Sequence, residues 1–331
     1  MILIISKKKL EPSTEAVIDW LKFFNQSFLR INGDDLYSRN LFKIESNLNE
    51  VSAFYKINGQ YTNLNEINFT SAWYRRWSDN DHLNKLFLSP MSHEHFQMIN
   101  QVSGFDIGDI RNFFIKQLNV NTWLSDPRYV NVNKLTVLKL ANAEQIDIPD
   151  SIICSDLESL RNFKGTREII TKDISNPYYF YIDGYRIASY TTEITNTTLE
   201  TLPQTFAPSL FQELIEKEYE VRSFYLAGKF FSMAIFSQKD EKTRIDFRNY
   251  NGKVPNRTVP YQLDAGLEDK LRRVFEKLNL NSGSVDLIKS KAQKMVFLEI
   301  NPIGQYGMTS GPCNYNLDKE IAEFLINEHE S

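Results

Sequence analysis

The sequence is poor in cysteine and histidine, which excludes several classes of site. Its two cysteines, Cys154 and Cys313, cannot build a disulfide framework, and they lack the CxxC or CxxH spacing that a tetrahedral zinc site requires. The four histidines have no metal-like neighbours along the chain. We therefore expect a protein of the reducing cytoplasm that has neither a disulfide framework nor a zinc site.

Long apolar runs and an excess of positive charge are also missing. No segment approaches the roughly 20 apolar residues that span a bilayer, and neither end has a cationic stretch followed by a cleavable apolar run. The net charge of −4 gives no general attraction to nucleic acid, and no recognisable nucleic-acid-binding motif is present. We therefore expect no membrane and no nucleic acid among the partners. The sequence has no GxxxxGK[ST] loop and no kinase-like glycine-rich loop, so phosphate binding by a P-loop is excluded.

The composition is that of a globular chain with more than one folding unit. At 331 residues and 42% apolar content it can bury large cores. The first domain is expected over 1–125 and begins with the apolar run MILIIS, an amphipathic helical segment and a second apolar run, which is the pattern of a βαβ unit with a parallel sheet. Asn58-Gly59 predicts a hairpin turn, and a long helix is expected from about 91 to 119.

Two further domains are expected after Asp126-Pro127. The first, over 126–205, is a small α+β unit with a hairpin about Asp183-Gly184 and a Thr/Asn-rich loop or mobile connection over 191–205. The second, over 206–331, has two strands joined at Ala227-Gly228, a helix, paired strands around 284–300 and a final helix.

Three oxygen donors stand out in the paired strands SVDLI and MVFLEI. Asp286 lies on the first strand, and Glu299 and Asn301 lie at the end of the second, where alternation puts both on one face. Two carboxylates and an amide oxygen are hard donors that suit Mg²⁺, with water and phosphates completing its shell. Taken alone, the same residues also fit a solvated hairpin end with a turn-forming Asn-Pro.

The segment FQELIEKEYEVRSF precedes these strands and resembles the hinge of the ATP-grasp superfamily. The resemblance implies that Glu213, Leu214 and Ile215 contact adenine. It also implies that Glu220, seven positions after the hinge Glu, holds the ribose hydroxyls. The family's D-x(13)-E-x-N-P signature, matched by Asp286, Glu299 and Asn301, implies two Mg²⁺ ions beside ATP.

The same resemblance assigns cations to the nucleotide phosphates. Lys172 and Lys134 are expected to contact them, and Arg222 to neutralise charge on the transferred phosphoryl group. A solvated surface position is the alternative for either lysine. The implied fold class is α/β, an ATP-grasp fold with an N-terminal parallel-sheet domain, a central α+β lid domain and a C-terminal α+β domain.

The short motifs SAWYRRW, IDFRNY and NPIGQYG resemble one branch of the superfamily, the graspetide synthetases. The tail EINPIGQYGMTSGPCNYNLDKEIAEFL and the opening MILIISKK look most like the maturases of grasp-with-spasm peptides. The resemblance implies an ATP-dependent macrocyclase that joins Glu or Asp side chains of a ribosomal precursor peptide to Thr, Ser or Lys side chains. The partner is then a peptide with a leader and a core. A homodimer is left open by the sequence.

Substrate-side roles are implied for two residues of IDFRNY. Arg248 is expected to hold the reacting carboxylate or acyl phosphate, and Asp246 to orient it or to receive the nucleophile's proton. The alternative is a strand-end salt bridge. Arg75 and Arg76 either belong to the site or pair locally beside a packed Trp73 and Tyr74.

One position departs from the wider superfamily. Ser284 stands two residues before the predicted metal Asp, where peptide-ligating relatives often carry arginine, so phosphate neutralisation must rest on other cations.

Two other functions remain as hypotheses. One is a RimK-like ligase that adds an amino acid to a peptide or protein carboxylate. The other is a nucleotide-binding protein without turnover, and the intact charged positions argue against it.

Overall fold

The computed structural model describes residues 1–37, 41–47, 51–77, 93–175, 179–182, 185–188, 191–238 and 255–330. They form two compact units, Met1–Asn131 with Asn316–Ser331, and Val132–Tyr315. No described helix is long and apolar enough to cross a membrane.

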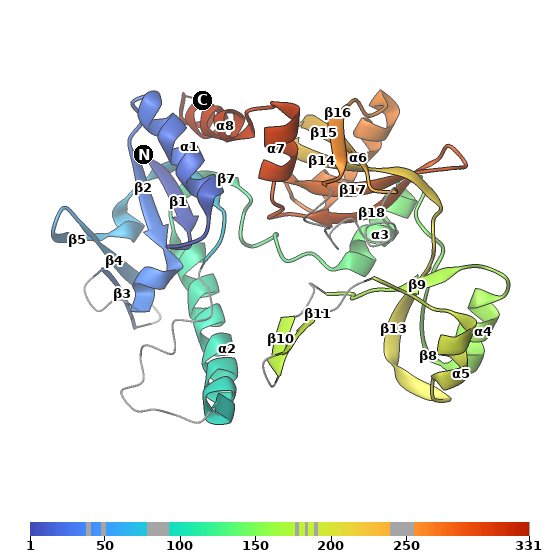
Figure 1. The fold of residues 1–331 in the computed structure, drawn as a ribbon. Coiled ribbons are helices and arrows are strands. Elements are labelled where there is room, and N and C mark those ends of the chain that lie inside the picture. Colours follow the sequence, from blue (N-terminus) through green and yellow to red (C-terminus); the bar gives the residue numbers. More distant parts are fainter. Residues whose placement is uncertain are drawn as a thin grey trace. The chain divides into compact units, whose positions relative to one another are not determined.

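The first unit is built on a parallel sheet with the strand order β2-β1-β6-β7 (Figure 1). Its elements are β1 (Ile2–Ser6), α1 (Pro12–Phe23), β2 (Phe28–Asn32), a 3-10 turn (Gly33–Tyr37), β3 (Phe42–Ser46), β4 (Val51–Ile57), β5 (Gln60–Asn63), a second 3-10 turn (Leu64–Glu66), β6 (Phe69–Tyr74), α2 (His93–Gln117), β7 (Val120–Leu124) and α8 (Leu317–Glu330). Every residue of β1 is buried, as its continuous apolar run predicts for a central parallel strand. The predicted βαβ start and parallel sheet are confirmed.

The last helix of the chain packs in this first unit. Helix α8 contacts α1, β1 and β6, and the Ser71 hydroxyl donates to the Leu325 carbonyl oxygen over 2.7 Å. The sheet therefore gains a cover from residues more than 240 positions away in sequence. The sequence predicts the helix itself but not this packing partner, and the three-domain division stays a prediction.

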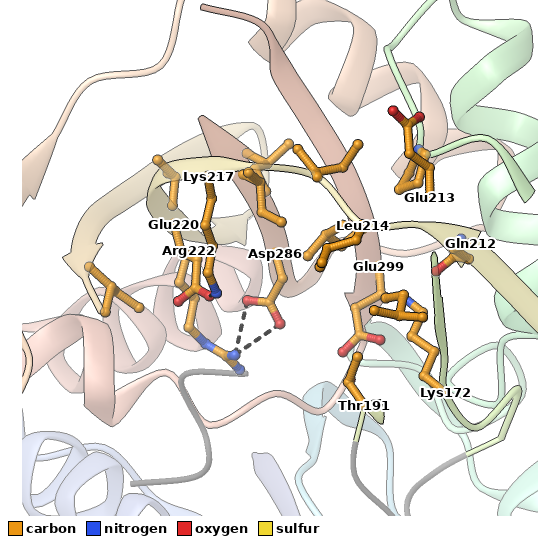
Figure 2. A pocket seen from close by; sticks show the side chains of 18 residues that line it. Lys172, Thr191, Gln212, Glu213, Leu214, Lys217, Glu220, Arg222, Asp286 and Glu299 are labelled. Atoms are coloured by element: carbon orange, nitrogen blue, oxygen red, sulfur yellow. Dashed lines mark hydrogen bonds and ion pairs between the residues drawn. The ribbon is translucent and has the colours of Figure 1, made fainter. Parts of the chain in front are cut away.

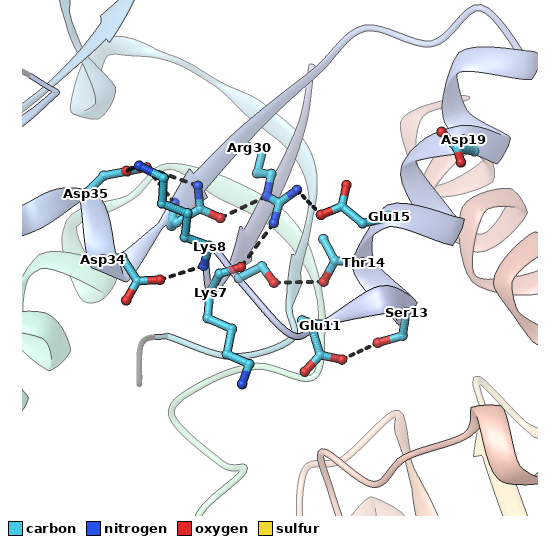
Figure 3. A network of polar contacts seen from close by, with 12 residues as sticks. Lys7, Lys8, Glu11, Ser13, Thr14, Glu15, Asp19, Arg30, Asp34 and Asp35 are labelled. Carbon is cyan, nitrogen blue, oxygen red and sulfur yellow. Dashed lines mark hydrogen bonds and ion pairs between the residues drawn. The ribbon is translucent and has the colours of Figure 1, made fainter. Parts of the chain in front are cut away.

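A polar network follows the carboxyl ends of β1 and β2 in the same unit (Figure 3). The Arg30 guanidinium donates to Asn32 Oδ1 over 2.8 Å, to the Lys7 carbonyl oxygen over 3.0 Å and to Glu15 Oε1 over 2.6 Å. Asp34 accepts from the Lys8 backbone N–H over 2.5 Å. These bonds fix the loops where the strands end.

The second unit contains two larger sheets and a hairpin (Figure 1). Its elements are α3 (Lys134–Ala143), β8 (Ser151–Asp156), α4 (Leu157–Lys164), β9 (Ile169–Thr171), β10 (Tyr179–Ile182), β11 (Tyr185–Ala188), β12 (Thr192–Glu193), α5 (Asn196–Thr201), β13 (Thr205–Glu213), β14 (Lys217–Leu226), β15 (Lys229–Phe236), β16 (Arg257–Tyr261), α6 (Ala265–Lys277), β17 (Ser282–Ser290), β18 (Met295–Asn301) and α7 (Gly307–Cys313). The antiparallel order β16-β15-β14-β17-β18 makes the larger sheet, and β12-β9-β13-β8 makes the smaller one.

Helices α3 and α6 pack with the larger sheet around one apolar core. Leu138, Leu271 and Phe275 belong to this core together with Val285 and Phe297 of the central strands. The Asp264 side chain caps α6 by accepting from the backbone N–H groups of residues 266 and 267. The predicted helix and paired strands are confirmed, so the face of β14, β17 and β18 away from this core remains for polar side chains.

Two predicted hairpin turns have positive φ at both central residues, a conformation that Asn and Gly favour and Ala does not. Asn58 and Gly59 have φ of 49° and 87°, and Ala227 and Gly228 have 44° and 95°. Positive φ at both central residues defines the type I′ turn, which matches the twist of the flanking strands. The predicted turn at Asp183-Gly184 lies outside the described residues.

The prediction of a loop over 191–205 is wrong. Residues 192–193 form β12, and 196–201 form the short helix α5, capped by the Thr195 hydroxyl. Ile194 and Leu199 are buried in the core of the smaller sheet. These two apolar side chains anchor a segment whose many Thr and Asn residues hide any periodicity.

Candidate active site

A cavity in the second unit brings most of the predicted nucleotide and metal residues together (Figure 2). The space within its walls is about 830 Å³ when the open mouth is included. Predicted residues in its walls are Lys172, Glu213, Leu214, Ile215, Glu220, Arg222, Asp286 and Glu299. Thr191, Gln212 and Lys217 also line it and were not predicted as site residues.

The hinge after β13 is held by bonds to its neighbours. The Glu213 N–H donates to the Asp150 carbonyl oxygen and the Leu214 N–H to the Glu168 carbonyl oxygen, each over 2.9 Å. The buried Gln212 amide donates to the Ser151 hydroxyl over 2.8 Å. Within the described residues, Ile215 has no backbone hydrogen bond, so its N–H and C=O can serve a ligand at the cavity wall.

Strand β14 turns three charged side chains toward the cavity: Lys217, Glu220 and Arg222. Lys217 and Glu220 form an ion pair and are 5% and 7% exposed. In a regular strand, residues three apart point to opposite faces. The register of β14 against β17 shifts by one residue between Lys217 and Tyr219, which restores a common face. Strict alternation of side chains along the strand would place Lys217 and Glu220 on opposite faces, so the sequence does not predict this pair.

Arg222 and the predicted metal carboxylates follow across the same sheet. Arg222 is the Cα partner of Asp286, and Asp286 is the Cα partner of Glu299. The Arg222 Nη1 donates to both Asp286 carboxylate oxygens, over 3.0 and 3.1 Å. A second register shift, after the Asp286–Glu299 pair, turns both Leu298 and Glu299 toward the cavity.

Lys134 begins α3 and reaches the edge of this charged row. Its Nζ lies 3.1 Å from Glu299 Oε2 and donates to the Asp173 carbonyl oxygen over 2.9 Å. The Asn133 side chain caps the helix and so fixes its first residue. Lys134 is therefore in an ion pair rather than solvated on the surface, although it is not among the cavity-lining residues.

The protein oxygens here could supply part of an Mg²⁺ coordination shell, with a ligand and water supplying the rest. Among the described residues no group of three His, Cys, Asp or Glu side chains gathers around one point. The predicted set instead has two carboxylates on directly paired residues, Asp286 and Glu299, and an amide, Asn301, on the same face as Glu299. Adjacent like charges repel, and here each has a cation, Arg222 and Lys134 respectively. Mg²⁺ commonly takes one or two carboxylates and completes its shell with phosphates and water.

The chain after Asn301 passes close to the preceding strand. Asn301 is the Cα partner of Ser284, and the Gly304 N–H donates to the Asn301 carbonyl oxygen over 3.1 Å. A Cβ on Gly304 would lie 2.4 Å from Ser284 Oγ, so only glycine fits there. Tyr306 is 2% exposed and packs on Phe224 with ring centroids 5.3 Å apart. The predicted NPIGQYG motif therefore fixes the course of the chain beyond Asn301.

Four predicted residues are not placed in this cavity by the described part of the chain. Asp246 and Arg248 lie outside the described residues. Arg75 and Arg76 belong to the first unit, where both pair with Glu11, Arg75 over 3.1 Å and Arg76 over 2.8 Å. Burial favours the neutral acid, but Arg75, then the Ser13 hydroxyl and Arg76, hold the pKa of Glu11 below its ordinary range. This geometry is the local pairing that the sequence left as one alternative.

No protein-family model and no curated protein matches the chain, whereas many solved structures do. The chain matches a Chryseobacterium gregarium RiPP-associated ATP-grasp ligase in complex with ADP and a leader and core peptide. That match has 20% identity, a TM-score of 0.83, and covers 99% of this chain and 97% of that one.

Two further matches have the same extent. The macrocyclase MdnC from Microcystis aeruginosa MRC, bound with precursor peptide MdnA, is 23% identical with a TM-score of 0.80 and 99% of each chain covered. The ATP-grasp ligase PsnB, complexed with minimal precursor, Mg and ADP, is 14% identical with a TM-score of 0.74, covering 99% of this chain and 97% of that one.

These likenesses show that the chain has the ATP-grasp fold over nearly its whole length. The predicted fold class is confirmed. The roles of the individual site residues stay predictions.

Proposed function

We propose that this chain is an ATP-dependent carboxylate ligase that closes rings in a ribosomally made precursor peptide. The observation that carries the proposal is the single cavity in which the hinge, Glu220, Arg222 and both strand carboxylates meet. Solved structures of the same fold include ATP-grasp ligases in complex with precursor peptides, which supports a peptide as the substrate.

ATP is proposed to occupy the cavity. Glu213, Leu214 and Ile215 would hold adenine through hinge backbone groups and apolar contact, and Glu220 would accept from the ribose hydroxyls. Lys172 and Lys134 would bind the phosphates. Charged donors in a partly buried wall bind phosphate strongly because little water screens them.

Magnesium is proposed to bind with the nucleotide, as two ions held by Asp286, Glu299 and Asn301. Bound Mg²⁺ would neutralise phosphate charge during transfer. If these carboxylates held a metal, Arg222 and Lys134 would be free to bind the phosphates.

The proposed reaction has two steps. A Glu or Asp carboxylate oxygen of the peptide attacks the γ-phosphorus, the bond to ADP breaks, and an acyl phosphate forms, with Arg222 stabilising the charge. A Thr or Ser hydroxyl or a Lys amine then attacks the acyl carbon, and phosphate leaves. In this proposal Arg248 holds the reacting carboxylate and Asp246 receives the nucleophile's proton.

The test is to incubate the purified protein with ATP, Mg²⁺ and small acidic peptides encoded beside its gene, and to follow peptide mass. We expect each ring to lower the mass by one water molecule, and Asp286→Asn to abolish this change. A gain of one amino-acid residue would instead establish a RimK-like ligase. ADP without a change in the peptide would also contradict the macrocyclase, and no ADP at all would leave a nucleotide-binding protein without turnover.

A further inference from the structure

The cavity contains a lysine to which neither the motif spacing nor the proposed reaction gives a role. Lys217 is the first residue of β14, its side chain is 4% exposed, and its ammonium pairs with the Glu220 carboxylate. Figure 2 shows the charged ends of the two side chains next to each other in the cavity wall, beside the Arg222–Asp286 pair.

Burying this pair is not needed for packing alone. Removing two charges from water costs several kcal/mol, and apolar side chains of similar size are often at least as stabilising. The chain also departs from regular strand geometry to form the pair, because the one-residue register shift is what gives Lys217 and Glu220 a common face. Because this pair is costly and lies in the wall of a ligand cavity, a function of the Glu220 carboxylate explains it better than packing does.

The pair restricts where the Glu220 carboxylate can point. A glutamate has three side-chain torsions, and an ammonium donor on one oxygen removes most of that freedom. Glu220 lies between Lys217 on the same strand and Arg222 two positions further along it, and all three line the cavity. The carboxylate is thus held in place before any ligand arrives.

We propose that Lys217 is a positioning residue that sets the Glu220 carboxylate to accept from both ribose hydroxyls, and so makes the site selective for ribonucleotides. The inference rests on the proposed function, because it takes Glu220 as the ribose acceptor. A hydrogen bond to a charged group is worth about 1.5–3 kcal/mol, which corresponds to roughly 10- to 100-fold in affinity. A nucleotide without the 2′-hydroxyl should bind more weakly by about that factor.

The experiment measures the dissociation constants of ADP and 2′-deoxy-ADP by calorimetry in the presence of Mg²⁺. The wild type is expected to prefer ADP by roughly tenfold or more. Lys217→Met should bring the ratio of the two constants close to one by weakening ADP more than 2′-deoxy-ADP. The matched control is Lys291→Met, which removes an exposed lysine paired with Glu216 over 3.1 Å and should leave the ratio unchanged.

A second variant guards against loss of folding. Lys217→Met with Glu220→Gln removes both charges, so that no buried carboxylate is left without its cation, and it should also lose the preference for ADP. If Lys217→Met weakens both nucleotides by the same factor, or lowers only thermal stability, the lysine is structural and the inference is wrong. A wild type that binds neither nucleotide overturns the proposed function and the inference together. A wild type that binds both equally overturns the inference alone.

Discussion

Two clusters of ion pairs in this molecule, each made of carboxylates and basic side chains, differ in their balance of charge. In the first unit one carboxylate, Glu11, is shared by Arg75 and Arg76. In the cavity of the second unit two carboxylates, Asp286 and Glu299, are adjacent, and each has a cation from another element. A shared carboxylate ties loops together, whereas adjacent carboxylates gain when a divalent cation replaces their partners. The number of adjacent carboxylates separates the structural cluster from the candidate site.

The largest expected effect tests the structural side of the comparison. Arg75→Ala should lower the free energy of unfolding by about 3–5 kcal/mol, because a buried carboxylate loses a buried partner. Urea unfolding measures this. ADP affinity of the folded protein should stay as in the wild type. The control is Arg128→Ala, which removes an exposed arginine paired with Asp126 and should change stability by less than about 1 kcal/mol. If Arg75→Ala leaves the free energy of unfolding unchanged, Arg75 has no structural role and the comparison fails.

Arg222→Ala should affect turnover more than stability. We expect the rate of peptide-dependent ADP release to fall by about 10²- to 10³-fold, since Arg222 is the proposed charged donor at the transferred group. Its control in the same unit is Arg167→Ala, where the pair with Asp150 is half-exposed, and the rate should not change. Equal losses in both variants would sink the assignment of Arg222.

Lys134→Met tests whether the cavity carboxylates wait for a metal. Without nucleotide, Mn²⁺ should bind up to about fivefold more tightly, because Glu299 no longer has a competing ammonium. With nucleotide, Mg·ADP should bind more weakly, because the proposed phosphate contact of Lys134 would be lost. Mn²⁺ titration by electron paramagnetic resonance follows the first effect, and a weaker Mn²⁺ affinity in the variant would refute the exchange of partners.

The smallest effect is the pH dependence of the Glu11 cluster. The pKa of Glu11 is lowered in the folded chain, so its ionised form contributes stability that is present above about pH 4.5 and is lost as the pH falls through the folded pKa. The slope should not exceed about 1.4 kcal/mol per pH unit for this one group. Glu11→Gln should be less stable at neutral pH. Its free energy of unfolding, measured with urea, should also fall less steeply as the pH is lowered. An identical slope in both proteins would show that other carboxylates dominate.

Local patterns predicted those parts of the fold that local physics determines. The type I′ turn at Asn58-Gly59 follows from both residues, the turn at Ala227-Gly228 from its glycine alone, and the central parallel strand from the run ILIIS. The ATP-grasp resemblance of the hinge and strand motifs also led to the fold that the solved structures show. Each of these features is encoded by a few neighbouring residues or by a fixed spacing, so a single sequence is enough to predict it.

What sequence reasoning missed depends on register and on distant partners. Lys217 is three positions from Glu220, and only a one-residue shift against β17 makes them neighbours. Ile194 and Leu199 are buried although Thr and Asn surround them. The packing of α8 with the first unit joins segments with no sequence signal in common. Bulges and tertiary contacts are set by the whole fold, so a single sequence does not reveal them.

The close approach of Gly304 to Ser284 links two positions that sequence comparison would treat separately. A side chain larger than serine at 284 would meet the chain beyond Asn301, because a Cβ on Gly304 would already lie 2.4 Å from Ser284 Oγ. A larger residue at 284 therefore requires that segment to move. Among homologues we expect residues 284 and 304 to change together.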